Sequence, residues 1–411
     1  MAITLTETPA ITREGETVNI LTASNKLLFE FTAGASEASL QVQVQDASSG
    51  VLGTLKTVPF NSDSTLTIDA GFILRNQLNN DDDSDNTRGS NDFSGVGSTA
   101  PFKLAYRVGG TGSYTVLSTL YQAVRGVRQY GSTYGASVAD YTPLMTGTTV
   151  DYTGKFLTLF ENPVLFWYAD GTPATSADVS VFQSQLAFPM RLADYTVIQV
   201  LRAIWRNKAG TSSNTQSYVD AGTNTAIITF AIPEAESAFE WDTVGITVGT
   251  NNGAGNLGNT AIDTITFQIQ RACNNPTALK WINSLGAWEC WVFEGRTPYS
   301  LDTDSLGGEY GIYQADISTA TESRRYLNKS ARKSVSLFAD NLLIDQVQAI
   351  SEIVTSPHVI MYVGDLVGGT DFTDWEGVTI DAGSFRVEDT YDKRHKISLD
   401  VNMIDILTIS N

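Results

Sequence analysis

Three carboxylates near a pair of glycines carry the chemistry that would matter most in an enzyme. Asp302 and Asp304 precede Gly307 and Gly308, and Glu309 follows. A glycosidase uses two carboxyl groups roughly 5 to 10 Å apart across the sugar. These residues therefore make a polysaccharide hydrolase the third function to consider, behind two non-enzymatic ones.

Three tryptophans lie in one short segment, residues 273–293, which also holds both cysteines. Trp281, Trp288 and Trp291 could act as platforms on which sugars stack. We favour core and interface roles, since aromatic side chains dominate the energetics of cores and contacts. We expect them to be mostly buried, at a junction between the second and last domains.

An aspartate-rich loop resembles a calcium-binding pattern. Asp81, Asp83 and Asp85 have the alternating spacing of an EF-hand loop, with Asp92 at the twelfth position. The sixth position is Asn86 where an EF-hand has glycine, and the last ligand is not the usual bidentate glutamate. We favour a solvated loop and keep the three aspartates as a weak calcium candidate.

Other catalytic patterns are missing from the sequence. The two histidines, His358 and His395, stand far apart and outside any recognised motif, and a zinc site needs several His or Cys ligands at short spacing. Cys273 and Cys290 are too few for a disulfide framework, and we expect buried thiols, with a mutual bond as the alternative. The sequence therefore predicts a non-enzyme without a cofactor.

One basic island interrupts an acidic chain. The 411 residues carry a net charge of −19, whereas five basic residues gather at Arg324, Arg325, Lys329, Arg332 and Lys333. Acidity this strong argues against nucleic-acid binding over the general surface. The island is either a solvated face or a patch that docks on the acidic surface of a neighbouring copy, and both interpretations stay open.

The elements that must position these residues are mostly strands. Short alternating or apolar runs separated by Gly, Asn, Asp and Ser predict a mainly β protein built from β-sandwich-like domains. We expect a first sandwich over residues 1–148 and a second over 149–295, with residues 156–160 as one strand. The amino terminus resembles no signal peptide, and no apolar run approaches a membrane span.

The last part, residues 296–411, has a different pattern. Leu343, Val347, Ile350 and Val354 repeat at helical spacing, which predicts one helix over about 340–355 with Asp340 or Asn341 as its N-cap. Strand patterns flank it, so the sequence predicts a C-terminal α+β domain.

The amino-acid sequence of the aromatic segment also resembles a known family. From Cys273 to Phe293 the chain reads Cys-Asn-Asn-Pro, then Leu-Lys-Trp-Ile-Asn, Leu-Gly-Ala-Trp-Glu and Trp-Val-Phe. This pattern resembles tail structural proteins of phages and prophages of Bacteroidetes-type bacteria. The order strand, helix, strands in the last part is similar to the tube-type domain of distal tail and hub proteins.

The resemblance implies a structural virion protein of the tail tip or baseplate, made in the bacterial cytoplasm and assembled as a ring. It implies a homo-oligomer whose partners are other tail proteins and, potentially, a host-surface glycan. Interface residues would be the three tryptophans with Arg324, Arg325 and Arg332. The alternative is a carbohydrate-binding adhesin or tail-fibre module.

Overall fold

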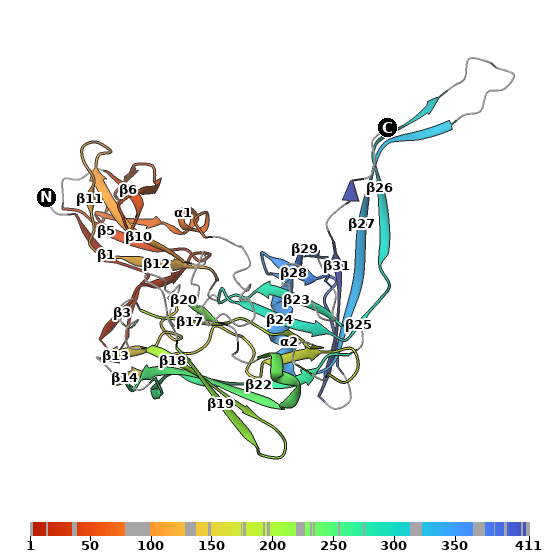
Figure 1. Cartoon of the computed structure of the whole chain (residues 1–411). Coiled ribbons are helices and arrows are strands. Elements are labelled where there is room, and N and C mark those ends of the chain that lie inside the picture. The colour runs from red at the N-terminus through yellow and green to blue at the C-terminus, as the bar shows by residue number, and fades with distance from the viewer. Residues whose placement is uncertain are drawn as a thin grey trace.

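The chain is mainly β, as the sequence predicts. A computed structural model gives three strand-rich regions in chain order and one long hairpin that projects from the last of them (Figure 1). It describes residues 3–13, 15–34, 39–78, 99–127, 137–146, 149–173, 175, 178–191, 194, 198–218, 227–230, 232, 235–253, 255–273, 276–312, 323–364, 375–381, 383–389, 393–403 and 406–407.

The first region is a sandwich of two sheets. A three-stranded sheet, β1-β5-β9, shares a core with a larger sheet, β4-β12-β10-β6-β7, to which β8 and β11 add. Phe29 packs edge-on against both Phe102 and Tyr121 inside this core. The strands are β1 Thr4–Glu7, β2 Ile11–Arg13, β3 Glu16–Val18, β4 Ile20–Thr22, β5 Leu28–Thr32, β6 Ser39–Asp46, β7 Val51–Thr54, β8 Val58–Pro59, β9 Thr65–Asp69, β10 Thr99–Val108, β11 Thr115–Val116 and β12 Tyr121–Val124, with the short helix α1 Gly71–Arg75.

The second region is a six-stranded sheet, β16-β15-β22-β21-β18-β19, with smaller pairs beside it. Its core encloses Trp205 and Phe188, both fully buried. The elements are β13 Leu144–Thr146, β14 Thr149–Tyr152, β15 Val164–Tyr168, β16 Ser180–Phe182, β17 Leu186–Pro189, β18 Ile198–Arg206, β19 Ser212–Tyr218, β20 Ile227–Phe230, η3 Ala235–Glu240, β21 Thr243–Asn251 and β22 Leu257–Arg271.

The third region is a ten-stranded sheet that begins earlier in the chain than we expected. Its main path is β24-β23-β28-β29-β31-β27-β25, with β26, β30 and β32 paired to its members. The elements are β23 Thr277–Ile282, β24 Trp288–Phe293, β25 Gly295–Arg296, β26 Ser300–Ile312, β27 Ser323–Leu342, α2 Ile344–Ser351, η4 Glu352–Val354, β28 Val359–Tyr362, β29 Trp375–Ile380, β30 Arg386–Asp389, β31 His395–Asn402 and β32 Ile406–Leu407. The sheet thus takes in residues 277–293, which the sequence interpretation had put at the end of the second sandwich.

The predicted helix is shorter than expected and starts later. Strand β27 runs through Asp340 and Asn341, our predicted N-caps, and the helix α2 begins only at Ile344. Leu343 is the N-cap, and its backbone amide donates to Gln346 Oε1 at 2.9 Å. The buried side chains of Ala339 and Leu342 keep this stretch in the sheet, so packing outweighs the helical spacing.

The predicted strand over residues 156–160 is wrong. This segment has bends at Leu157 and Leu159 and forms no strand. Phe156 lies in the second core, Leu157 in a smaller core at the centre of the molecule, and Phe160 in the third core. Its apolar residues therefore serve three separate cores and do not form one face of a sheet.

Candidate functional site: the aromatic hairpin and the projecting arm

The three tryptophans lie in one antiparallel hairpin, β23–β24, which we call the aromatic hairpin. All twelve residues of its two strands are buried. Trp281 and Trp288 have no exposed surface, and Trp291 is 5% exposed. Both faces of the hairpin are covered, which explains why its strands are apolar at most positions and show no polar–apolar alternation.

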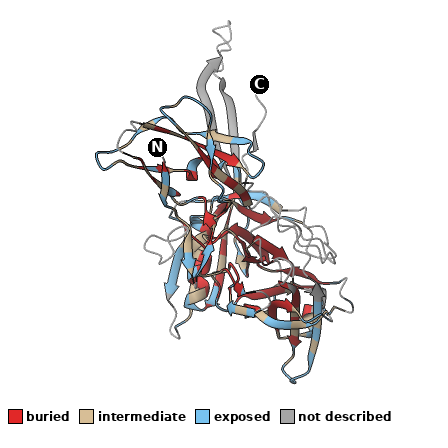
Figure 2. Cartoon of the chain, turned by 90° about the vertical axis from the view of Figure 1, so that its left-hand side faces the viewer, coloured by how far each residue is buried: buried red, intermediate tan, exposed pale blue. Residues whose placement is uncertain are grey.

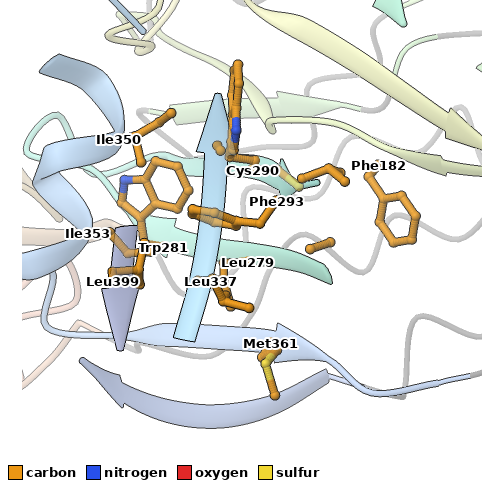
Figure 3. Close-up of a cluster of buried hydrophobic side chains, with 14 of the residues drawn as sticks. Phe182, Leu279, Trp281, Cys290, Phe293, Leu337, Ile350, Ile353, Met361 and Leu399 are labelled. Atoms are coloured by element: carbon orange, nitrogen blue, oxygen red, sulfur yellow. The ribbon is translucent and has the colours of Figure 1, made fainter. Parts of the chain in front are cut away.

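One face of the hairpin closes the core of the third region. Trp281 lies among side chains of the helix and the sheet, including Ile350, Leu337 and Leu399 (Figure 3). Trp291 stacks on Phe160, with ring centroids 5.6 Å apart, and meets Phe166 edge-on at 5.1 Å. Because Phe160 and Phe166 belong to the second region, this face joins the second and third regions.

The other face holds Trp288. Its ring meets the ring of His358 at 5.3 Å, and Ile282 and Ile360 complete a small buried cluster. The imidazole ring of His358 therefore packs against the ring of Trp288. The amino group of Lys280 lies 4.4 Å from the ring centre of Trp375, a cation–π contact on the same face.

A buried carboxyl group anchors the hairpin from within. Glu289 Oε1 accepts hydrogen bonds from the Leu159 amide and from Asn283 Nδ2, both at 2.9 Å. Asn283 Nδ2 also donates to the Leu157 carbonyl at 2.9 Å. Burial away from water raises the pKa of Glu289, because it disfavours the charged form. We did not single out Glu289 from the sequence, although a lone acid inside an apolar strand is a visible signal.

The turn of the hairpin presses against the first region. A Cβ added to Gly286 would lie 2.3 Å from the Arg125 carbonyl oxygen, and one added to Gly126 would lie 2.7 Å from the Ser284 carbonyl oxygen. The Val127 amide donates to Ser284 O at 2.6 Å. Leu285 and Ala287 fill a core with residues of the first and second regions. The hairpin therefore contacts all three regions, and buried residues run through the centre of the molecule in Figure 2.

The basic island and the three carboxylates lie together on a second hairpin, which we call the arm and define as residues 300–312 and 323–334. β31 pairs with β27 only from Ser334 onward, and within the arm the short strand β32 pairs with β27 at Ser330 and Ala331. The register sets Asp302 opposite Arg332, Tyr310 opposite Arg325 and Gly311 opposite Arg324. Arg332 is exposed. Asp302, Asp304 and Glu309 thus lie on β26, and the basic residues lie on its partner strand β27.

The remaining candidate residues are the aspartate-rich loop and the two cysteines. Asp81, Asp83 and Asp85 lie outside the described residues, within which no cluster of metal-ligating side chains occurs. Cys273 and Cys290 form no disulfide; Cys290 is buried as expected, whereas Cys273 is only half-buried, and its Sγ donates to the Glu294 carbonyl at 2.9 Å. No helix in the described part of the chain is long and apolar enough to cross a membrane.

Comparison with known proteins identifies no family. No protein-family model matches the chain, and no curated protein matches it. Among solved structures, the chain is similar to the native conformation of E. coli alpha-2-macroglobulin, at 8% identity and a TM-score of 0.18. That match covers 95% of this chain and 19% of the other, so the chain spans about a fifth of that protein's length.

Proposed function

We propose that this protein is a structural component of a bacteriophage tail, at the tip or baseplate, and that its copies assemble into a ring. The sequence resemblance of the aromatic segment supports this proposal, as does the mainly β fold. On this proposal the C-terminal part is a tube-type domain of the kind found in distal tail and hub proteins. The protein's role is to form contacts with other proteins, and it catalyses no reaction.

The arm is the observation that carries the proposal. Strand β26 has 13 residues, so the arm is roughly 40 Å long at about 3.3 Å per residue. Within the described residues β26 pairs with β27 alone. An unpaired strand edge is a template for pairing with another chain, and Figure 1 shows this edge projecting from the molecule.

Charge favours one arrangement of the arms. The acidic residues lie on β26 and the basic residues on β27. If β26 of one copy pairs with β27 of the next, the unlike strands meet, and like strands are kept apart. Such a contact joins different surfaces of the two copies, and repeated contacts of that kind close into a ring when the rotation permits.

The proposed setting follows from the same resemblance. The protein is made in the bacterial host cytoplasm and becomes part of the virion, where its partners are further copies of itself and other tail proteins. The aspartate-rich loop with Asp81, Asp83 and Asp85 stays a candidate for weak calcium binding, to be tested by titration.

The test is to shorten the arm and observe assembly. Ser305 lies opposite Lys329, so residues 306–328 can be replaced by Asn-Gly, which favours the tight turn of a two-residue hairpin. We expect rings of the full chain in electron micrographs and by light scattering, and monomers of the shortened variant with an unchanged melting temperature. A full chain that stays monomeric at high concentration would contradict the proposal.

The alternative functions lose part of their basis. A sugar-stacking platform needs an exposed ring face, whereas Trp281 and Trp288 are fully buried within the chain. An adhesin would therefore need another site. The carboxylates considered for the hydrolase, Asp302 and Asp304, lie on β26 of the arm. In the strand register they are opposite Arg332 and Ser330 of β27.

A further inference from the structure

A polar cavity of about 500 Å³ opens where the second and third regions meet. Its lining comes from five stretches of the chain: residues 162–166, 268–270 of β22, 291–294, 339–346 at the end of β27 and the start of α2, and Arg394. Gln268 and Gln270 contribute from β22, Asp340 and Asn341 from β27, and Gln346 from α2. Its volume lies within the range of about 300 to 1,000 Å³ that is usual for small-molecule sites.

The backbone holds several of these polar groups in place. Gln268 and Gln270 are two residues apart on one strand, so they lie on the same face of the sheet. The pairing of β27 with β31 is interrupted between Ala339 and Leu342, and Asn341 has a φ of 60°. Bulges of this kind re-aim side chains and are common beside binding sites. Gln346 is buried, and its hydrogen bond from the Leu343 amide orients the side-chain amide.

The lining has the chemistry that recognises hydroxyl groups. Side-chain amides both donate and accept hydrogen bonds, as each hydroxyl of a sugar does. Phe166 and Trp291 also belong to the lining, but their rings are buried and packed against each other, so the polar groups carry the recognition. Glu294 and Asp340 add two carboxylates, which accept from hydroxyls, and Arg394 adds one guanidinium, so the charged groups of the lining have an excess of negative charge that disfavours anions. We propose that this cavity binds a neutral sugar unit of a glycan.

The proposed sugar site is independent of ring assembly. The arm and the cavity share no residue, so shortening the arm leaves the cavity intact. A protein that binds sugar without assembling, or assembles without binding sugar, would separate the two proposals. The cavity also offers the adhesin-type partner, a host-surface glycan, a site that does not depend on an exposed tryptophan ring.

The experiment is a glycan array followed by titration calorimetry with the glycan retained. The array carries neutral glycans of hexoses and N-acetylhexosamines beside acidic glycans that contain uronic or sialic acid. We expect at least one neutral glycan to bind the full chain and acidic ones to be rejected. Replacing Gln268 and Gln270 together with alanine should weaken binding at least tenfold, because both side chains are exposed and line the cavity.

The matched control is Gln348→Ala, an exposed glutamine on α2 outside the cavity lining. It should bind the glycan as the unchanged protein does, and all variants should keep the same melting temperature. Three results would overturn the proposal. These are an array without any neutral glycan bound, binding of acidic glycans alone, and undiminished affinity in the Gln268→Ala, Gln270→Ala variant.

Discussion

The aromatic hairpin and the arm are two antiparallel hairpins of one sheet, separated by only a few residues, yet they have opposite surroundings. Every residue of β23 and β24 is buried, and their neighbours come from all three regions. The strands of the arm, in contrast, extend away from the body of the molecule (Figure 1). Pairing in a hairpin is the same in both, so the side chains decide which hairpin is enclosed and which projects.

Composition explains this difference. The aromatic hairpin carries three tryptophans and a single acid, whereas the arm carries three acids, five bases and several glycines. Burying the first removes a large apolar area from water, which stabilises the fold at about 25 cal/mol per Å². Burying the arm would desolvate many charges. Variants of the first should therefore change stability, and variants of the second should change association.

The largest loss of stability should follow Trp281→Ala. The side chain is fully buried among helix and sheet residues, so its removal leaves a cavity and should lower the free energy of unfolding by about 3–5 kcal/mol. Chemical denaturation followed by circular dichroism measures this change. Phe72→Ala is the control, since Phe72 is 51% exposed and should cost far less. Equal losses in both variants would mean that the hairpin is not the packed centre of the molecule.

The same burial has a consequence for truncation. A chain that ends near residue 320 would lose Leu337, Ile350 and Leu399, the partners of Trp281. The domain bounds expected from the sequence would leave such a fragment with two complete sandwiches, residues 1–148 and 149–295. The shared core instead predicts that this fragment unfolds or aggregates, because it would expose a large apolar face.

The next effect should follow Gly286→Ala in the hairpin turn. Gly286 has a φ of +92°, and a new Cβ would meet the Arg125 backbone at 2.3 Å. Gly171→Ala is a matched control, because its φ is +87° and nothing lies within 4 Å of its added Cβ. Both variants carry the strain of positive φ, about 1–3 kcal/mol. A further loss in Gly286→Ala alone would measure the contact between the hairpin and the first region, and equal melting temperatures would argue against that contact.

Glu289→Gln should give a smaller effect that depends on pH. Burial raises the pKa of Glu289 above its usual value of 4.5, so the folded state binds the proton more tightly than the unfolded state. The contribution of this residue to stability is full below about pH 4.5 and decreases as pH rises through the folded pKa. Glutamine keeps the acceptor oxygen for Leu159 and Asn283 without the charge. The variant should therefore melt higher than the unchanged protein at pH 8, with the difference shrinking toward pH 4. A constant difference would contradict a buried titrating group.

Local pattern predicted many of the strands and missed how they share cores. Strands such as Val164–Tyr168 and Trp375–Ile380 are short apolar or alternating runs between turn signals, the pattern from which the mainly β fold was predicted. Residues 156–160 have the same apolar pattern but pass between three cores. Apolar spacing reports that a residue is buried, and only tertiary structure shows which core encloses it.

The two hairpins were predictable to different degrees. The tryptophans could be assigned to a junction from composition alone, and all three prove to be buried. The register of the arm, which sets Asp302 opposite Arg332, depends on how two strands align and has no signal in either strand by itself. The cavity near Gln268 draws residues from five separate stretches of the chain, so only the folded chain brings them together.

The smallest effect on stability and the largest on association should follow charge reversal in the arm, Arg324→Glu with Arg325→Glu. These positions lie on β27 near the far end of the arm, opposite Gly311 and Tyr310. Surface substitutions of this kind usually change the free energy of unfolding by less than about 0.5 kcal/mol. Assembly should weaken, because two basic residues that would meet the acidic strand of the next copy become acidic. Light scattering against protein concentration measures the effect.

Salt concentration separates this contact from a general loss of folding. Screening shortens the range of exposed charges to about 8 Å at 0.15 M salt and about 3 Å at 1 M. Assembly of the unchanged protein should therefore weaken as salt rises, and the gap between it and the charge-reversed variant should narrow. Arg75→Glu with Lys103→Glu is the matched control, since it changes the same net charge in the first region, away from the arm. If this control weakens assembly as much as the arm variant does, net charge governs association and the arm has no special role.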